Sequence, residues 1–308
     1  MIVSAGEALI DLVPERAPDR ELPLLAPRLG GGPFNTARAL ARLGSPAAFC
    51  SRVSTDRFGA ALLAALHADG VDTSLVQRGP EPTSLAVAQV DGGSGSASYS
   101  FYVEGTADRL FGLPAPVAVP EGVSAVCFGT CSLVLEPGAT AYDRLLHAAA
   151  RRGVFTALDP NIRPGLIPDP AAYRARFLGR LPSVRLLKLS EEDAAWLADG
   201  RPVREAVGRW LAAGPRAVVL TRGADGLTVF PAEGGECSVP GVRVAVVDTI
   251  GAGDTAYAAL LHELGRRGGF TGTLDADAWR DVLGFAARAA AVSCTRAGAQ
   301  PPYARELA

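Results

Sequence analysis

The feature that most constrains the fold is a repeated alternation of short apolar runs with longer stretches rich in alanine and leucine. The short runs are typical of strands buried on both faces, and the longer stretches have the three- and four-residue spacing of helices. This alternation predicts an α/β fold with a mostly parallel central sheet flanked by helices. We expect strands at residues 47–53, 124–128, 154–158, 184–189 and 217–220, and helices at 58–69, 139–152, 171–180, 191–197 and 203–213.

Two regions, at about residues 12–29 and 84–107, depart from this alternation. The first is rich in proline, and the second holds strand-like runs at 84–90 and 97–103 that a glycine- and serine-rich loop joins as a hairpin. We expect the two regions to pair into a small antiparallel β lid inserted into a single domain of residues 1–308. Pairing of the lid's sheet edges between two chains predicts a homodimer.

Composition excludes several classes of partner. With 30 basic and 32 acidic residues the net charge is -2, so neither nucleic acid nor a membrane surface is an expected partner. No apolar run approaches the ~20 residues that span a bilayer, and the start shows no secretion leader. The five cysteines are scattered and odd in number, which favours reduced thiols and a cytoplasmic location over a disulfide framework.

The strongest motif lies late in the chain, where an apolar run ends at Gly251, Ala252, Gly253 and Asp254. A helix of small residues is expected to begin at about Ala252, so that backbone N–H groups and the helix dipole form an anion hole. Asp254 in the first turn could accept a proton from a hydroxyl attacking a phosphoryl group held there. Alternatively, Asp254 only caps the helix. The segment has neither the Lys-Ser or Lys-Thr of a Walker loop nor the glycine spacing of a dinucleotide fingerprint.

A second motif places Gly30, Gly31 and Gly32 before a helix that begins near Asn35. Exposed backbone and an amide side chain can hydrogen-bond a polyol without carrying charge, which suits a neutral sugar. A flexible loop followed by an ordinary helix cap explains the same residues.

Together the two motifs resemble the two signatures of the ribokinase-like sugar kinases, also called the PfkB carbohydrate kinase family, and among them the fructokinases. The resemblance extends along the chain through the segments 6–11, 56–59, 70–72, 159–163, 221–226 and 295–299. It implies a ribokinase-like fold and transfer of the γ-phosphate of ATP to a primary hydroxyl of a small sugar, with Asp254 as the base.

The resemblance also implies roles for individual residues of the sugar pocket. Asp11, at the end of the first strand, would bind sugar hydroxyls beside Gly31, Gly32 and Asn35. Phe101 and Tyr102 would close over the sugar from the lid, although aromatic residues in strands commonly only pack. Arg163 would neutralise charge during transfer, as in fructokinases and 2-keto-3-deoxygluconate kinases.

On the nucleotide side, the resemblance implies ATP contacts from Lys188, Thr221, Gly223 and Gly226, with Gly251 and Gly253, and a helix at 281–294 beside the adenine. The family's common Asn-x-x-Glu element appears here as Ser190 to Asp193. Glu192 and Asp193 are therefore expected to bind Mg²⁺ through water, or else to form a solvated charge cluster at a helix start. A potassium site is expected at Asp248, Ile250, Ser293, Arg296 and Gly298.

The substrate expected first is D-fructose, giving fructose 6-phosphate. The alternatives within the enzyme class are 2-keto-3-deoxygluconate, ribose and nucleosides. Outside that class stand a sugar-binding regulator without turnover, which the intact 251–254 motif argues against, and a dinucleotide-dependent oxidoreductase, which lacks an early glycine fingerprint.

Overall fold

The large sheet of the computed structural model confirms the predicted parallel core. The structure describes residues 1–15, 23–90 and 97–307. Nine strands pair in the order β13-β12-β11-β10-β9-β8-β1-β4-β5, and all neighbours are parallel except at β12 and β13, two strands that the alternation did not predict. The strands are β1 Ile2–Ala5, β4 Ala47–Ser54, β5 Val76–Gly79, β8 Ala125–Gly129, β9 Phe155–Asp159, β10 Leu186–Ser190, β11 Ala217–Thr221, β12 Leu227–Pro231 and β13 Cys237–Val239.

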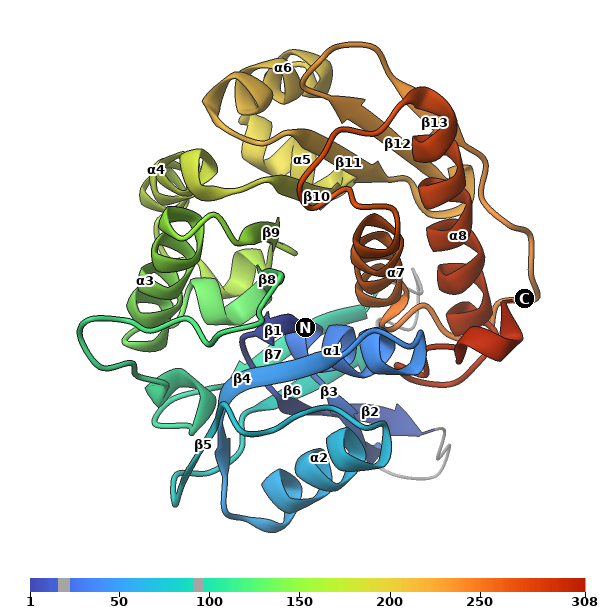
Figure 1. Ribbon diagram of the computed structural model, residues 1–308. Coiled ribbons are helices and arrows are strands. Elements are labelled where there is room, and N and C mark those ends of the chain that lie inside the picture. The colour runs from blue at the N-terminus through green and yellow to red at the C-terminus, as the bar shows by residue number, and fades with distance from the viewer. Residues whose placement is uncertain (16–22, 91–96, 308) are drawn as a thin grey trace.

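Helices cover both faces of this sheet because successive strand residues point to opposite sides. Ile2 joins one buried cluster with residues of α1, α7 and α8, whereas Val3 joins another with residues of α3, α4 and α6. Figure 1 shows α7 and α8 side by side. The helices are α1 Gly32–Arg42, α2 Arg57–Ala68, α3 Gly138–Arg151, α4 Pro170–Arg180, α5 Glu191–Ala198, α6 Val203–Ala213, α7 Ala252–Arg266 and α8 Ala276–Cys294. The last begins before the predicted residue 281 because Asp275 caps it, accepting from the N–H of Ala278 at 2.8 Å.

The predicted small sheet is present, in the order β3-β2-β6-β7. Its strands are β2 Leu9–Glu15, β3 Leu24–Gly30, β6 Leu85–Val90 and β7 Ala97–Tyr102. The pairs β2–β3 and β6–β7 are antiparallel, while β2 and β6 run parallel. Residues 16–22 and the hairpin loop 91–96 lie outside the described residues.

One expectation about the small sheet is corrected. Asp11 was placed at the end of the first strand, but it lies inside β2, paired with Arg28 of β3. The physical reason is Gly6, whose φ of 151° ends β1 and lets the chain turn into the second sheet before Asp11 is reached.

The fold brings the carboxyl ends of β8, β9, β10 and β11 to one edge of the large sheet. Ligands of open α/β sheets bind at this edge. Among the helices in the described part of the chain, none has both the length and the apolar character that crossing a membrane requires.

Candidate active site

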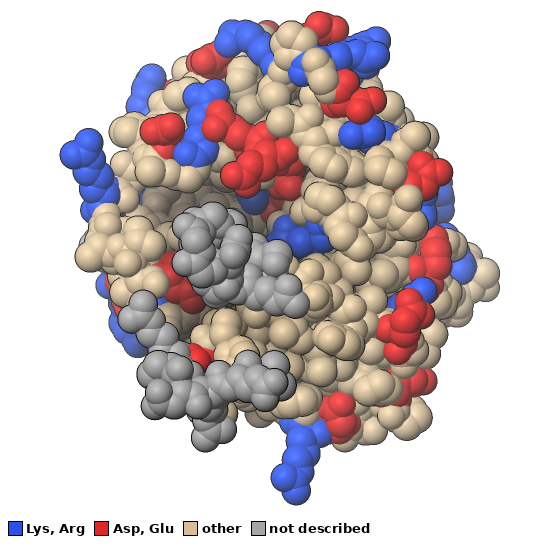
Figure 2. All heavy atoms as spheres, turned by 180° about the vertical axis from the view of Figure 1, so that it is seen from behind, with Lys and Arg blue, Asp and Glu red and all other residues tan. Residues whose placement is uncertain are grey.

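A cavity of about 670 Å³ opens at this edge, bounded also by residues of the small sheet. On the face drawn in Figure 2, acidic and basic side chains lie close together beside a hollow in the surface. The cavity gathers most of the predicted site residues, namely Asp11, Gly31, Gly32, Asn35, Phe101, Arg163, Lys188, Glu192, Asp193, Thr221, Ile250, Gly251, Gly253 and Asp254. Residues from two motifs at opposite ends of the chain therefore line one space.

Asp254 links these two motifs directly. Asn35 Nδ2 donates a hydrogen bond of 2.9 Å to Asp254 Oδ2, which leaves Oδ1 for another partner. Burial raises the pKa of the Asp254 carboxyl group, against the opposing effects of the Asn35 hydrogen bond and of Lys188 and Arg163. A carboxylate with a raised pKa is a stronger proton acceptor, so the environment of Asp254 suits a general base.

The anion hole is formed by the first turn of α7. Gly251 precedes the helix with a φ of 75°, a left-handed conformation that glycine adopts without strain. The N–H of Ala252 donates to Thr249 O at 3.2 Å. The N–H groups of Gly253 and Asp254 lie in the first turn, where the helix itself offers them no acceptor. A methyl group on Gly253 would lie 3.3 Å from Lys188 Nζ. A phosphate at this helix start would therefore meet both free N–H groups and an ammonium group.

Lys188 is held in place by a buried ion pair. Its Nζ lies 2.7 Å from Asp159 Oδ2, and both side chains are 5% exposed. Burial lowers the pKa of Lys188, but the charge and hydrogen bond of Asp159 outweigh burial, so the pKa of the lysine is raised overall. Burial also raises the pKa of Asp159 to about 6, despite the neighbouring ammonium group. Asp159 Oδ1 is buried with no hydrogen-bond partner among the described residues.

The two residues expected at magnesium differ in their surroundings. Both oxygens of Asp193 are engaged, Oδ1 by the N–H of Ile162 at 2.8 Å and Oδ2 by the N–H of Ser190 at 3.3 Å. Asp193 thus completes the capping box of α5 with Ser190 and fixes the loop before Arg163. Glu192 lines the cavity and is exposed. The unpartnered Asp159 Oδ1 and the open Glu192 carboxylate are oxygen donors of the kind that Mg²⁺ takes, directly or through water.

Arg163 reaches the cavity from the loop after β9. Its Nη1 donates to Asn161 Oδ1 at 2.7 Å and to Asn161 O at 3.2 Å. Asn161 has a φ of 41°, a left-handed conformation that asparagine tolerates better than most residues. These contacts hold the guanidinium group at the cavity wall.

On the sugar side, Asp11 faces the cavity from β2, and Phe101 faces it from β7. Burial, and then the nearby Asp254, raise the pKa of Asp11 to about 6. Tyr102 lies on the opposite face of β7 and is 62% exposed. Tyr99 takes the expected place of Tyr102, stacking on Phe101 with ring centroids 6.1 Å apart, because residues two apart share one face of a strand.

Several predicted residues lie outside the cavity lining: Ala252, Gly223, Gly226, Asp248, Ser293, Arg296 and Gly298. Position 226 requires a glycine because the backbone of Val239 lies close to it: a methyl group there would be 2.0 Å from Val239 O.

The residues expected to bind potassium lie close together. Asp248 accepts from the N–H of Ile250 at 3.0 Å and of Gly298 at 2.8 Å. Arg296 donates its N–H to Ser293 O at 3.2 Å.

The cavity also holds residues that the sequence analysis did not single out. They include Glu7, Tyr99, Thr130, Cys131, Asn161 and Trp196. The period of two along β7 could have found Tyr99 beside Phe101. Glu7 lies in the segment 6–11 that carries the family resemblance, whereas Thr130 belongs to no motif with a known spacing.

Glu7 leads to a prediction about stability and pH. It is 1% exposed, and burial raises its pKa from 4.5 to about 7. Between these values the folded state holds a proton that the unfolded state has released, so Glu7 stabilises the fold least at high pH. Relative to Glu7→Gln, the wild-type protein should lose about 3 kcal/mol of unfolding free energy as pH rises from 4.5 to 8. Denaturant unfolding of both proteins across this range measures the difference, and parallel pH curves would contradict the prediction.

Known proteins are similar to this chain over most of its length. A model of the family described as pfkB family carbohydrate kinase matches residues 1–306. The sequence is 38% identical over 264 residues to a fructokinase of Rhizobium leguminosarum bv. trifolii, covering 86% of this chain and 79% of the relative.

Two solved structures are similar over nearly the whole chain. A fructokinase from Xylella fastidiosa with bound ATP has a TM-score of 0.89 and 26% identity, covering 99% of this chain and 96% of that one. A fructokinase from Vibrio cholerae O395, with fructose, ADP and calcium ion bound, has a TM-score of 0.82 and 25% identity, covering 97% and 94%.

Proposed function

The chain belongs to the pfkB family of carbohydrate kinases, and from that premise we propose that this ATP-dependent sugar kinase phosphorylates D-fructose to fructose 6-phosphate. The observation that carries the proposal is the 2.9 Å hydrogen bond from Asn35 to Asp254. It joins the glycine-led helix of the sugar side to the anion hole of the phosphate side. A base held between an acceptor pocket and a phosphate site is the arrangement that phosphoryl transfer to a hydroxyl requires.

In the proposed mechanism, Asp254 Oδ1 accepts the proton of the attacking primary hydroxyl. Asn35 orients the base, because its Nδ2 is already committed to Asp254 Oδ2. The N–H groups of Gly253 and Asp254, together with Lys188, hold the γ-phosphate, and Arg163 neutralises charge as the bond to the leaving group breaks. Asp11 binds sugar hydroxyls from β2. Positioning and charge neutralisation supply most of the rate acceleration.

Metal ions complete the proposed site. We infer that Glu192 and the unpartnered Asp159 Oδ1 hold Mg²⁺, through water where needed, and that Asp193 fixes the adjoining loop. When bound, Mg²⁺ shields the charge of the phosphates. The segments joined by Asp248 support the potassium proposal, because the hydrogen bonds of its half-buried carboxylate bring the expected residues Ile250 and Gly298 together.

Fructose is favoured over the alternatives by the names of the most similar relatives and by the fructose-bound Vibrio cholerae structure. 2-Keto-3-deoxygluconate, ribose and nucleosides remain the competing acceptors. The gathering of Asp254, Lys188 and Arg163 around one cavity argues against a regulator without turnover.

The proposal extends to the lid, the oligomer and the compartment. Tyr99 and Phe101 line the cavity from the small sheet, which supports its role as a lid that excludes water from the reaction. Its strand β3 carries Leu24 and Leu25, which are 45% and 39% exposed, and pairing at this edge would form a homodimer. All five cysteines are free, which supports a cytoplasmic enzyme.

The function is tested by ADP release from ATP and Mg²⁺ with a panel of fructose, 2-keto-3-deoxygluconate, ribose and adenosine, each with and without potassium. We expect the highest kcat/KM for fructose and a rate increase with potassium. Faster turnover of another panel member would replace fructose as the substrate. ADP release from none of them, by folded protein that binds ATP, would contradict the kinase mechanism.

A further inference from the structure

Thr130 has an unusual backbone conformation at the floor of the cavity. It follows β8 as the first residue of a 3-10 turn, Thr130–Leu133, and has a φ of 60°. A left-handed conformation is rare for a β-branched residue, because the side chain crowds the backbone. Such strain persists where surrounding contacts impose it, and it occurs frequently at functional sites.

The Thr130 hydroxyl lies near the carboxylate of Asp254, the proposed base. A methyl group on Gly32 would lie 2.4 Å from Thr130 Oγ1 and 3.2 Å from Asp254 Oδ1, so both oxygens border the same small space. Asp254 Oδ1 is the oxygen that Asn35 leaves free. Thr130 is 7% exposed and lines the cavity, and its hydroxyl has no hydrogen-bond partner among the described residues.

The strained turn is fixed from two sides. On one side, Ser132 donates its N–H to Glu7 Oε2 at 3.0 Å, and its hydroxyl donates to Gly129 O at 2.6 Å. From the other side, the buried Arg180 donates to Leu133 O at 2.9 Å.

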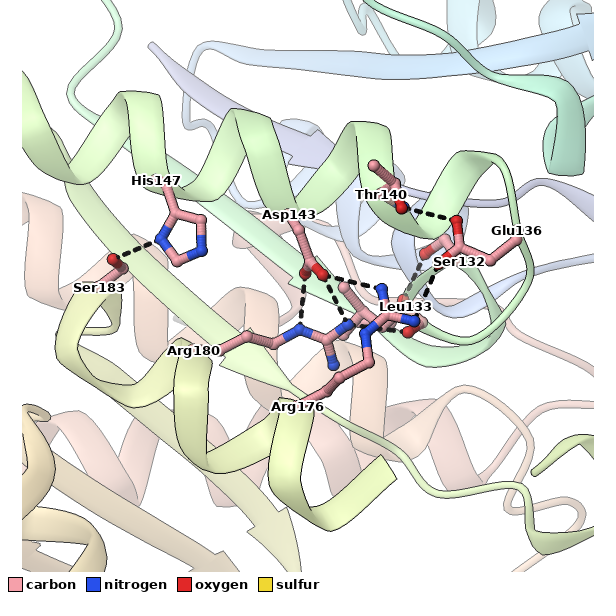
Figure 3. Close-up of polar contacts among 10 residues, drawn as sticks. Ser132, Leu133, Glu136, Thr140, Asp143, His147, Arg176, Arg180 and Ser183 are labelled. Atoms are coloured by element: carbon pink, nitrogen blue, oxygen red, sulfur yellow. Dashed lines mark hydrogen bonds and ion pairs between the residues drawn. The ribbon is translucent and has the colours of Figure 1, made fainter. Parts of the chain in front are cut away.

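Arg180 is itself held by an ion pair between two helices. Its Nε lies 2.6 Å from Asp143 Oδ1, and Arg176 binds the same carboxylate at 2.9 Å. Figure 3 shows both arginines of α4 pointing toward Asp143 of α3, with Leu133 beside them. The turn is therefore anchored to the helical layer, which keeps Thr130 in its strained conformation.

We propose that Thr130 is a substrate-contacting residue whose Oγ1 hydrogen-bonds the acceptor hydroxyl, the one that Asp254 Oδ1 deprotonates. The two oxygens flank one space, and a hydroxyl placed there would meet an acceptor for its proton and a neutral partner for its oxygen. Threonine can serve because its hydroxyl rotates to donate or accept. The contact selects sugars that place a primary hydroxyl at this point, and the inference rests on the proposed sugar kinase function.

Three variants test the contact. Thr130→Val keeps the β-branched shape and removes the hydroxyl, Thr130→Ser keeps the hydroxyl, and Thr140→Val changes an exposed threonine of α3 as a matched control. We expect Thr130→Val to lower kcat/KM for the sugar about 10-fold, the upper range for one neutral hydrogen bond, and Thr130→Ser to stay within about 3-fold of wild type. The Kd for ATP should not change. If the valine variant fails to fold, Thr130→Ala replaces it.

A binding measurement identifies the hydroxyl. Isothermal titration compares the sugar that the wild-type protein phosphorylates best with its analogue lacking the phosphorylated hydroxyl, which is 6-deoxy-D-fructose for fructose. Thr130→Val should weaken binding of the sugar and leave binding of the deoxy analogue unchanged. Equal weakening of both, or normal kinetics of Thr130→Val, would overturn the inference. A best substrate other than fructose would overturn the fructose assignment alone, and inactivity of the wild-type protein on every panel sugar would contradict both.

Discussion

Replacing Asp254 with asparagine is expected to lower kcat by at least ~100-fold, in the range of general-base contributions, with little change in the Kd for ATP. The substitution keeps the size of the side chain and an oxygen that can accept from Asn35, but it removes the basic carboxylate. Quenched-flow measurement of phosphoryl transfer, with equilibrium binding of ATP, separates the two effects. Asp277→Asn, at a side chain that is 89% exposed, is the matched control.

The pH profile gives a second measure of the same role. Because burial raises the pKa of Asp254, protonation should remove the base at a higher pH than for an ordinary aspartate. The kcat/KM of the wild-type enzyme should therefore fall as the pH is lowered through that pKa. The residual kcat/KM of Asp254→Asn should not show this fall. Turnover of Asp254→Asn near the wild-type value would reject the assignment of the base.

The second large effect is expected at Lys188. Lys188→Met leaves Asp159 buried beside an apolar side chain, and breaking a buried pair in this way costs about 3–5 kcal/mol of unfolding free energy. It also removes the ammonium group next to the anion hole. A loss of one preorganised electrostatic partner corresponds to a fall in kcat of about 100- to 1,000-fold.

The double variant Lys188→Met with Asp159→Asn separates these two consequences. It removes the unpaired carboxylate, so denaturant unfolding should show part of the lost stability restored. In steady-state kinetics its kcat should stay below that of Asp159→Asn alone, which lacks the same proposed Mg²⁺ ligand. Recovery of turnover together with stability would mean that Lys188 acts only through the fold.

The sequence predicted the parts of the site that follow from strand order and helix starts. Asn35 and Asp254 are far apart in the chain, yet both lie in the first turn of a glycine-led helix, and the structure joins them by a hydrogen bond. Lys188 was predicted by the family resemblance, and the structure places it in β10 beside the start of α7. For Asn35 and Asp254 a local pattern was enough, since glycine-led helix starts mark both positions.

Other parts depend on tertiary contacts that no local pattern carries. The period of two puts Tyr99 and Phe101 on one face of β7, but which face lines the cavity depends on the pairing of β7 with β6. Both carboxylate oxygens of Asp193 accept hydrogen bonds from backbone N–H groups, and one of these belongs to Ile162, which is distant in sequence. The strained turn at Thr130 is held by Glu7 and Arg180, which lie far from it in sequence. The sequence alone therefore does not identify Thr130 as a site residue.

The most direct test of the central claim is the position of the phosphate on the product. The wild-type enzyme is incubated with ATP, Mg²⁺ and ¹³C-labelled fructose, and the product is examined by ¹³C NMR for splitting of carbon signals by phosphorus. The proposed mechanism predicts that the phosphate lies on the C6 hydroxyl. Phosphate on C1 or on a ring hydroxyl, or ADP formed without a sugar phosphate, would contradict it.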